Sequence, residues 1–259
     1  MRRLLAALLL GLALAGTAAA AAHLPLAAEP IARLYLPWWK ARHEAKLAEA
    51  RAHPPELVFL GDSITQDYER AGPEPWRDFR PVWQRFYGDR HALNLGFVGD
   101  ATSHLLWRIE HGELDHMAPK AAVLLIGANN LGRLHWSAAD TVLGIETVVA
   151  EVHRRLPTTK ILLIGVLPSD RGEWVLRTTA EINAALAARY GGGTVPYVVY
   201  RDLTSLFMRG GSVETALFLD PKETPPRPAL HPTPEGMALM AAAIEPELSR
   251  MLGDRPRAR

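Results

Sequence analysis

The chain has 259 residues, of which 48% are hydrophobic, and its formal charge is +1 at neutral pH. This composition allows a full buried core and excludes a collagen-like, coiled-coil or disordered protein. The near-neutral charge gives no indication of nucleic-acid binding, and the absence of cysteine means that no disulfide bond stabilises the fold.

The first 22 residues are expected to be a signal peptide rather than part of the fold. Two arginines precede an apolar stretch over 4–15, and small residues in an A-x-A pattern follow near 20–22. This order is typical of secretory signals. An uncleaved membrane anchor is the alternative, because the apolar stretch with its alanines approaches the length that spans a bilayer. We therefore expect a periplasmic or secreted protein without stable membrane insertion, in which residues 23–259 form a single domain.

Five apolar runs of strand length follow along the chain, with helix-like segments between them. The runs begin at Glu56, His91, Ala121, Lys160 and Val195. Near-continuous apolar strands that alternate with helices are typical of a parallel sheet covered on both faces. The pattern therefore predicts an α/β fold: a three-layer α/β/α sandwich with a five-stranded parallel sheet, in the flavodoxin-like strand order 2-1-3-4-5.

Three helices are indicated in the second half of the chain. Residues 137–156 and 173–190 carry apolar residues at helical spacing. A last helix should begin at Thr233-Pro234, because threonine is a favourable N-cap and proline suits the first helical position. Between the fifth strand and this helix, residues 207–232 contain many prolines and glycines, which predicts a long irregular connection of the kind that often carries function.

Residues with useful chemistry follow three of the strands and precede the last helix. Ser63 follows the first strand, Gly99 the second and Asn129 the third, and His231 lies just before the helix. Because the carboxyl ends of parallel strands meet at one edge of a sheet, we expect all four residues there. A catalytic serine needs a base within hydrogen-bond reach and donors for an oxyanion, and these residues can supply both.

Each of these residues also has a structural interpretation. Ser63 and Asn129 could cap helices, and Gly99 could serve a turn that needs a positive φ. Asp62 and Asp100 are expected to hold loops by accepting backbone N–H bonds. The agreement of four separate segments nevertheless favours the catalytic interpretation.

Together the four segments resemble the sequence blocks of the SGNH hydrolases, also called GDSL esterases and lipases. The blocks are Gly61-Asp62-Ser63, the run Asn94-Leu95-Gly96-Phe97-Val98-Gly99-Asp100, "GANN" from Gly127 and "HPTPEG" from His231. The resemblance covers essentially the whole mature chain. The run "GDATSHLLWRIEHGEL" from Gly99 and the residue Asn130 are most similar to the platelet-activating-factor acetylhydrolase-like branch.

The resemblance implies a role for each matching residue. Ser63 would be the nucleophile and His231 the base. The backbone N–H groups of Ser63 and Gly99 and the side chain of Asn129 would form the oxyanion hole.

One position departs from the family pattern, which places an aspartate three residues before the catalytic histidine. Pro228 stands at that position. Asp220 could be the missing catalytic acid if residues 221–229 loop out between it and His231. Otherwise a backbone carbonyl would orient the imidazole and a Ser-His dyad would operate, so both arrangements stay open at this point.

Other hydrolytic schemes do not fit. There is no H-E-x-x-H motif and no cysteine, which argues against a zinc site. Thr65 stands where the α/β-hydrolase elbow G-x-S-x-G has its second glycine, and no P-loop motif occurs. The resemblance therefore implies an esterase for short, acetyl-type acyl groups that needs no metal or cofactor. Export favours an acetylated glycan or a small ester as substrate; an O-acyltransferase and an inactive glycan-binding domain are the alternatives.

Overall fold

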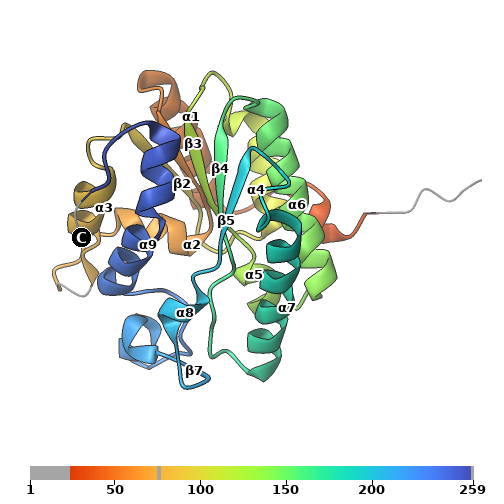
Figure 1. Cartoon of the computed structure of the whole chain (residues 1–259), viewed down its shortest axis with the longest axis vertical. Coiled ribbons are helices and arrows are strands. Elements are labelled where there is room, and N and C mark those ends of the chain that lie inside the picture. The colour runs from red at the N-terminus through yellow and green to blue at the C-terminus, as the bar shows by residue number, and fades with distance from the viewer. Residues whose placement is uncertain (1–23, 75–76, 258–259) are drawn as a thin grey trace, which may run out of the picture.

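The computed structural model describes residues 24–74 and 77–257 (Figure 1). The signal peptide expected over residues 1–22 lies outside the described residues. Within the described ranges, none of the helices combines the length and the apolar character needed to cross a membrane.

The centre of the fold is a parallel sheet with the strand order β2-β1-β3-β4-β5. The strands are β1 (Leu57–Gly61), β2 (Ala92–Gly96), β3 (Ala121–Leu125), β4 (Lys160–Ile164) and β5 (Val198–Arg201). Gly61 at the end of β1 pairs in register with Gly96 on β2 and Leu125 on β3, so these three strands end together. The predicted fold class and strand order are confirmed.

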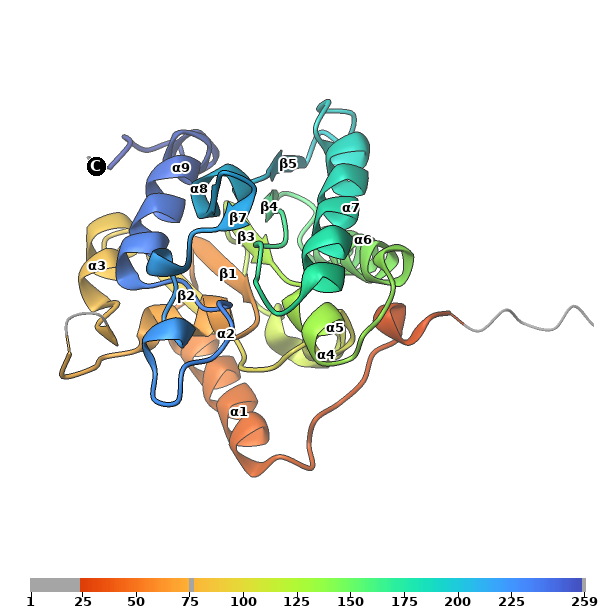
Figure 2. The same cartoon turned by 90° about the horizontal axis from the view of Figure 1, so that it is seen from below.

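Helices cover both faces of the sheet (Figure 2). On one side α3 and α9 pack together, and on the other side α6 packs against α4 and α7. These helices are α3 (Arg80–Tyr87), α4 (Thr102–Arg108), α6 (Ala138–Arg155), α7 (Glu173–Tyr190) and α9 (Pro234–Leu252). The last begins as predicted, because the Thr233 hydroxyl accepts a hydrogen bond from the backbone N–H of Gly236.

A long helix before the first strand, α1 (Pro37–Ala52), is not indicated by hydrophobic periodicity. Its buried residues are Trp39, His43, Lys46 and Ala50, two of which are polar, so its buried face does not read as an apolar stripe. The helix packs beside the π-type turn η4 (Ile109–Glu113).

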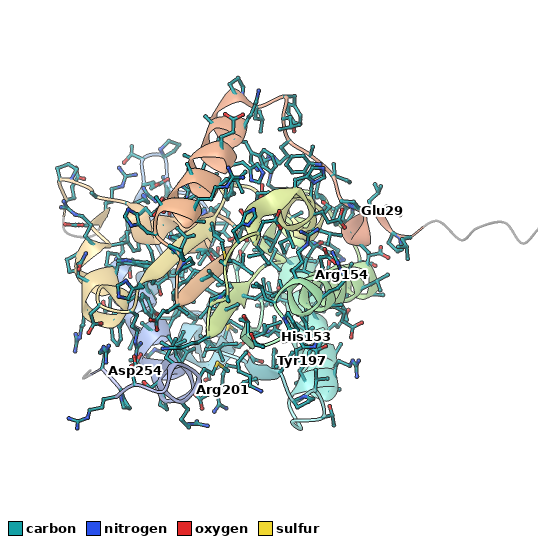
Figure 3. The ribbon with its side chains drawn as sticks, turned by 90° about the horizontal axis from the view of Figure 1, so that it is seen from above. Glu29, His153, Arg154, Tyr197, Arg201 and Asp254 are labelled. Carbon is teal, nitrogen blue, oxygen red and sulfur yellow. The ribbon has the colours of Figure 1, made fainter. Side chains whose placement is uncertain are left out.

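Shorter elements lie in the connections. They are η1 (Leu26–Ala28), α2 (Ser63–Gln66), η2 (Asp67–Glu69), α5 (Ala128–Gly132), α8 (Thr204–Phe207), β6 (Met208–Arg209), β7 (Ser212–Val213), η5 (Thr215–Leu217) and η6 (Asp220–Lys222). At the amino-terminal edge of the sheet, the rings of His153 on α6 and Tyr197 before β5 stack with their centroids 3.5 Å apart (Figure 3). This contact joins a covering helix to the last strand.

The connection from β5 to α9 is more ordered than the sequence suggests. It contains the small antiparallel hairpin of β6 and β7 and then returns to the loop before α9. There Phe218 bridges to Pro232, and the N–H of Leu219 donates to the carbonyl of His231 at 2.7 Å. This pairing places Asp220 beside His231.

Candidate active site

Ser63 lies at the carboxyl edge of the sheet because the chain turns sharply from β1 into α2. A Cβ at Gly61 would come within 2.5 Å of the Leu125 carbonyl, so only glycine fits this close approach. Oδ1 of Asp62 accepts a hydrogen bond of 2.9 Å from the backbone N–H of Ile64. Asp62 is thus the N-cap of α2, which confirms the prediction that it accepts a backbone N–H bond. The Ser63 hydroxyl is not used for capping and remains free for other contacts.

Three side chains form a continuous chain of contacts at this edge. Oγ of Ser63 lies 2.9 Å from Nε2 of His231, and Nδ1 of His231 lies 2.8 Å from Oδ1 of Asp220. Oδ2 of Asp220 accepts the backbone N–H groups of Leu230 at 2.9 Å and His231 at 2.6 Å. Ser63 is 6% exposed and Asp220 only 2%. The segment between Asp220 and His231 does loop out, and the three groups have the geometry of a Ser-His-Asp triad.

The charges of this chain of contacts are coupled. Burial disfavours the imidazolium, but the hydrogen bond and negative charge of Asp220 outweigh it and raise the pKa of His231. Burial would likewise raise the pKa of the Asp220 carboxyl, but its bonds to His231 and Leu230 hold that pKa below its ordinary value. Asp220 is therefore ionised at neutral pH and can stabilise a proton on His231.

The residues expected to bind an oxyanion follow β2 and β3, at the same edge of the sheet as Ser63. Gly99 has φ +75°, a conformation that favours glycine, and a Cβ there would come within 2.2 Å of Nη1 of Arg133. The amide nitrogen of Asn129 donates to the carbonyl of Asp100 at 2.9 Å and lies 3.5 Å from Oδ2 of Asp62. The second contact is too long for a strong hydrogen bond, so the Asn129 amide keeps an N–H for a ligand.

Asp100 does not hold its loop through backbone N–H groups, and that prediction is wrong. Oδ1 of this fully buried carboxylate accepts bonds from Nη1 of Arg33 and Nε1 of Trp39, each at 2.8 Å. Oδ2 accepts from Nε of Arg108 at 2.9 Å. A carboxylate without water is stable only when charged and polar partners surround it, and here the partners are side chains. Two of them precede the first strand, far from Asp100 in sequence, so no local pattern links them to it.

Arg108 also lies near the site, and no sequence motif indicates its role. Its guanidinium donates to the carbonyls of Gly61 and Leu95, each at 3.2 Å, and forms an ion pair with the buried Glu113. It also lies over the ring of Phe97, 3.9 Å from the ring centroid. Arg108 thus ties the ends of β1 and β2 together beneath the loops that carry Ser63 and Gly99.

A cavity of about 510 Å³ opens onto Ser63 and His231. Eight of its ten lining residues are polar or charged, and the full set is Ser63, Gln66, Asp67, Glu69, Arg70, Val98, Leu219, Glu223, Arg227 and His231. Across the part of the chain that the structure describes, no group of three or more His, Cys, Asp and Glu side chains is placed to hold a metal ion. The site offers a nucleophile, a base and hydrogen-bond donors, which is the equipment for acyl transfer.

Comparison with curated proteins shows related sequences. The human platelet-activating factor acetylhydrolase IB subunit alpha1 is 33% identical over 155 residues, which cover 60% of this chain and 62% of that protein. The rat alpha2 subunit is 35% identical over 150 residues, which cover 57% and 60%. The matches thus span less than two thirds of the length of these relatives.

Solved structures share the fold. A GDSL-like lipase from Bacteroides thetaiotaomicron superposes with a TM-score of 0.63 at 17% identity, covering 81% of this chain and 98% of that one. A catalytic mutant of an acetylxylan esterase from Geobacillus stearothermophilus gives a TM-score of 0.55 at 20% identity, with 79% and 97% covered. Residues 59–239 match the GDSL-like lipase/acylhydrolase family, which confirms the predicted resemblance. The chain belongs to that family.

Proposed function

We propose that the protein is an exported serine esterase that hydrolyses short-chain, acetyl-type esters. The observation that carries this proposal is the chain of contacts from Ser63 through His231 to Asp220, which ends at an open cavity. A serine hydroxyl is a weak nucleophile unless an oriented base stands beside it, and this arrangement meets that need.

The reaction would proceed through an acyl-enzyme. Oγ of Ser63 attacks the ester carbonyl carbon while Nε2 of His231 takes the hydroxyl proton, and Asp220 stabilises the imidazolium. The N–H groups of Ser63, Gly99 and the Asn129 side chain bind the tetrahedral oxyanion. The intermediate expels the alcohol, which receives the proton from His231. Water then attacks the acyl-enzyme while His231 takes a proton from it. The bond between the acyl carbon and Oγ of Ser63 breaks, Oγ takes the proton back from His231, and the carboxylic acid leaves.

The polar and charged side chains around the cavity support a polar alcohol as the leaving group. Eight of the ten lining residues are polar or charged, and the apolar ones are Val98 and Leu219. A long acyl or alkyl chain would have to displace water from charged groups without replacing their hydrogen bonds. An acetylated glycan or a small hydroxylated ester fits such a lining better, and relatives include acetylhydrolases and an acetylxylan esterase.

Export rests on the first 22 residues, in which two arginines, an apolar stretch and small residues follow one another. An exported esterase would meet acylated glycans or small esters outside the cytoplasm.

A chain-length series tests this function. Purified mature protein is assayed with p-nitrophenyl acetate and with p-nitrophenyl esters of longer acyl chains. We expect the highest kcat/KM for acetate and a steady fall with chain length. A preference for long chains would contradict the short-acyl assignment.

A second experiment, an analysis of the products, distinguishes hydrolysis from transfer of the acyl group to an alcohol. The same ester is incubated with and without an added sugar acceptor, and the products are separated by chromatography. Free acid as the main product in both cases is the expected result. An acylated acceptor as the main product would instead favour the O-acyltransferase, and the absence of turnover on every ester would favour an inactive glycan-binding domain.

A further inference from the structure

Asp67 is a buried carboxylate in the cavity for which the proposed reaction has no use. It follows Ser63 by one helical turn, and its backbone N–H donates to the Ser63 carbonyl. The residue is 5% exposed and lines the cavity together with Ser63 and His231. The backbone of Asp67 is therefore held one turn after the nucleophile, and its side chain lines the same cavity.

The other two carboxylates of the cavity are already occupied. Glu69 accepts bonds from Arg42 at 2.8 Å and Lys46 at 2.7 Å. Glu223 accepts a bond of 3.0 Å from Arg77 and forms a closer ion pair with Arg227. Each of these two carboxylates therefore already has two close, positively charged partners.

The partners of Asp67 are weaker. Nη1 of Arg70 lies 3.4 Å from each carboxylate oxygen of Asp67, which is long for a charge-assisted hydrogen bond. Burial raises the pKa of Asp67, and the charges of His231 and Arg70 oppose that shift without cancelling it. A carboxylate has about four acceptor sites, and the two long contacts from Arg70 leave Asp67 with capacity for a closer donor.

An open acceptor at this place selects for a donor on the substrate. We propose that Asp67 is a specificity residue that accepts a hydrogen bond from a hydroxyl of the leaving alcohol, so that the preferred substrates are acyl esters of sugars or other polyols. This inference rests on the proposed esterase function and deepens it. An ester whose alcohol has no free hydroxyl leaves the buried carboxylate without a partner and is disfavoured for that reason.

The test compares two esters that differ only in hydroxyl donors. One is a monoacetylated methyl xyloside, and the other is the same compound with its free hydroxyls methylated. The selectivity is the ratio of kcat/KM for the first ester to that for the second. In Asp67→Asn we expect this ratio to fall by roughly tenfold to a hundredfold, the range for losing one hydrogen bond to a charged group.

Asp89→Asn is the matched control. The Asp89 side chain is 71% exposed and pairs with Arg257, and it lies before β2 at the opposite edge of the sheet. The control should keep the wild-type ratio. Melting temperatures of both variants check folding, but a ratio of rates within one protein does not depend on how much of it is folded.

Two results would overturn the inference alone, and a third would overturn the proposed function with it. An unchanged ratio in Asp67→Asn, with or without a general loss of activity, would assign Asp67 to structure or to the charge of His231. A wild-type enzyme that prefers the methylated ester would contradict the donor requirement directly. If wild-type protein hydrolyses p-nitrophenyl acetate but either of these results appears, only the Asp67 inference fails. If it hydrolyses no ester at all, the proposed function fails with it.

Discussion

At the scale of single residues, we propose that the bond between His231 and Asp220 sets the pH range in which Ser63 can react. Asp220 both orients the imidazole and favours its protonated form, so the pKa of His231 is raised. Ser63 is activated only when His231 is unprotonated, so kcat/KM should rise with pH through that raised pKa and fall away on the acid side.

Asp220→Asn tests this coupling. Loss of the negative charge removes the main group that raises the pKa of His231, so the acid limb of the kcat/KM profile should move to lower pH. Turnover should fall by up to about ten thousandfold, because an amide also favours the wrong tautomer. An unchanged rate and profile would show that the dyad operates without Asp220.

Asn129→Ala tests the oxyanion hole. We expect kcat to fall roughly a hundredfold to a thousandfold. The variant should also lose about 1–2 kcal/mol of unfolding free energy, because the Asp100 carbonyl loses its donor. Steady-state kinetics and urea denaturation measure the two effects separately. Lost stability with full turnover in the folded fraction would make Asn129 a structural residue only.

The sequence was informative about Ser63, Gly99, Asn129 and His231, because each directly follows a strand or precedes a helix at the shared edge. It left Asp220 open. Asp220 and His231 are 11 residues apart in sequence. Only the folded connection, in which Phe218 pairs with Pro232, brings their side chains together. The side-chain partners of Asp100 could not be predicted from the sequence either, because Arg33 and Trp39 lie 67 and 61 residues away from it.

At the scale of elements, the loops after β1 and β2 are held by buried charges rather than by apolar packing. Arg108 contacts carbonyls at the end of both strands and pairs with two carboxylates, Asp100 and Glu113. Burial raises the pKa of Glu113 to about 7, and the charge and hydrogen bond of Arg108 oppose that shift, so Arg108 favours the ionised carboxylate.

Arg108→Met should therefore be strongly destabilising. It leaves two buried carboxylates short of a partner, and we expect a loss of about 3–5 kcal/mol in the free energy of unfolding. Arg209→Met is the control, because Arg209 is 83% exposed in its pair with Glu214 and should cost less than about 1 kcal/mol. Equal midpoints in urea for the two variants would contradict a structural role for Arg108.

Predictability at this scale follows the apolar pattern. The sheet strands and helix α6 were predictable because their buried residues are mostly apolar. Helix α7 was predictable because Val175, Ile182 and Leu186 recur at helical spacing, although Thr178, Thr179 and Asn183 are buried beside them. Helix α1 was not, since His43 and Lys46 occupy part of its buried face.

At the scale of the whole molecule, we propose a single catalytic domain that follows a cleaved signal peptide. We expect the protein recovered from the periplasm or medium of a bacterial host to begin near residue 23, as measured by intact mass. A protein that keeps its first residues and stays with the membrane fraction would favour the anchor instead.

The most direct test of Ser63 as the nucleophile is the rate of p-nitrophenyl acetate hydrolysis by the mature protein and by Ser63→Ala at equal concentration. We expect steady turnover in the wild type and a fall to near the uncatalysed rate in the variant, while the melting temperature stays close to that of the wild type. A Ser63→Ala protein that hydrolyses the ester as fast as the wild type would contradict Ser63 as the nucleophile.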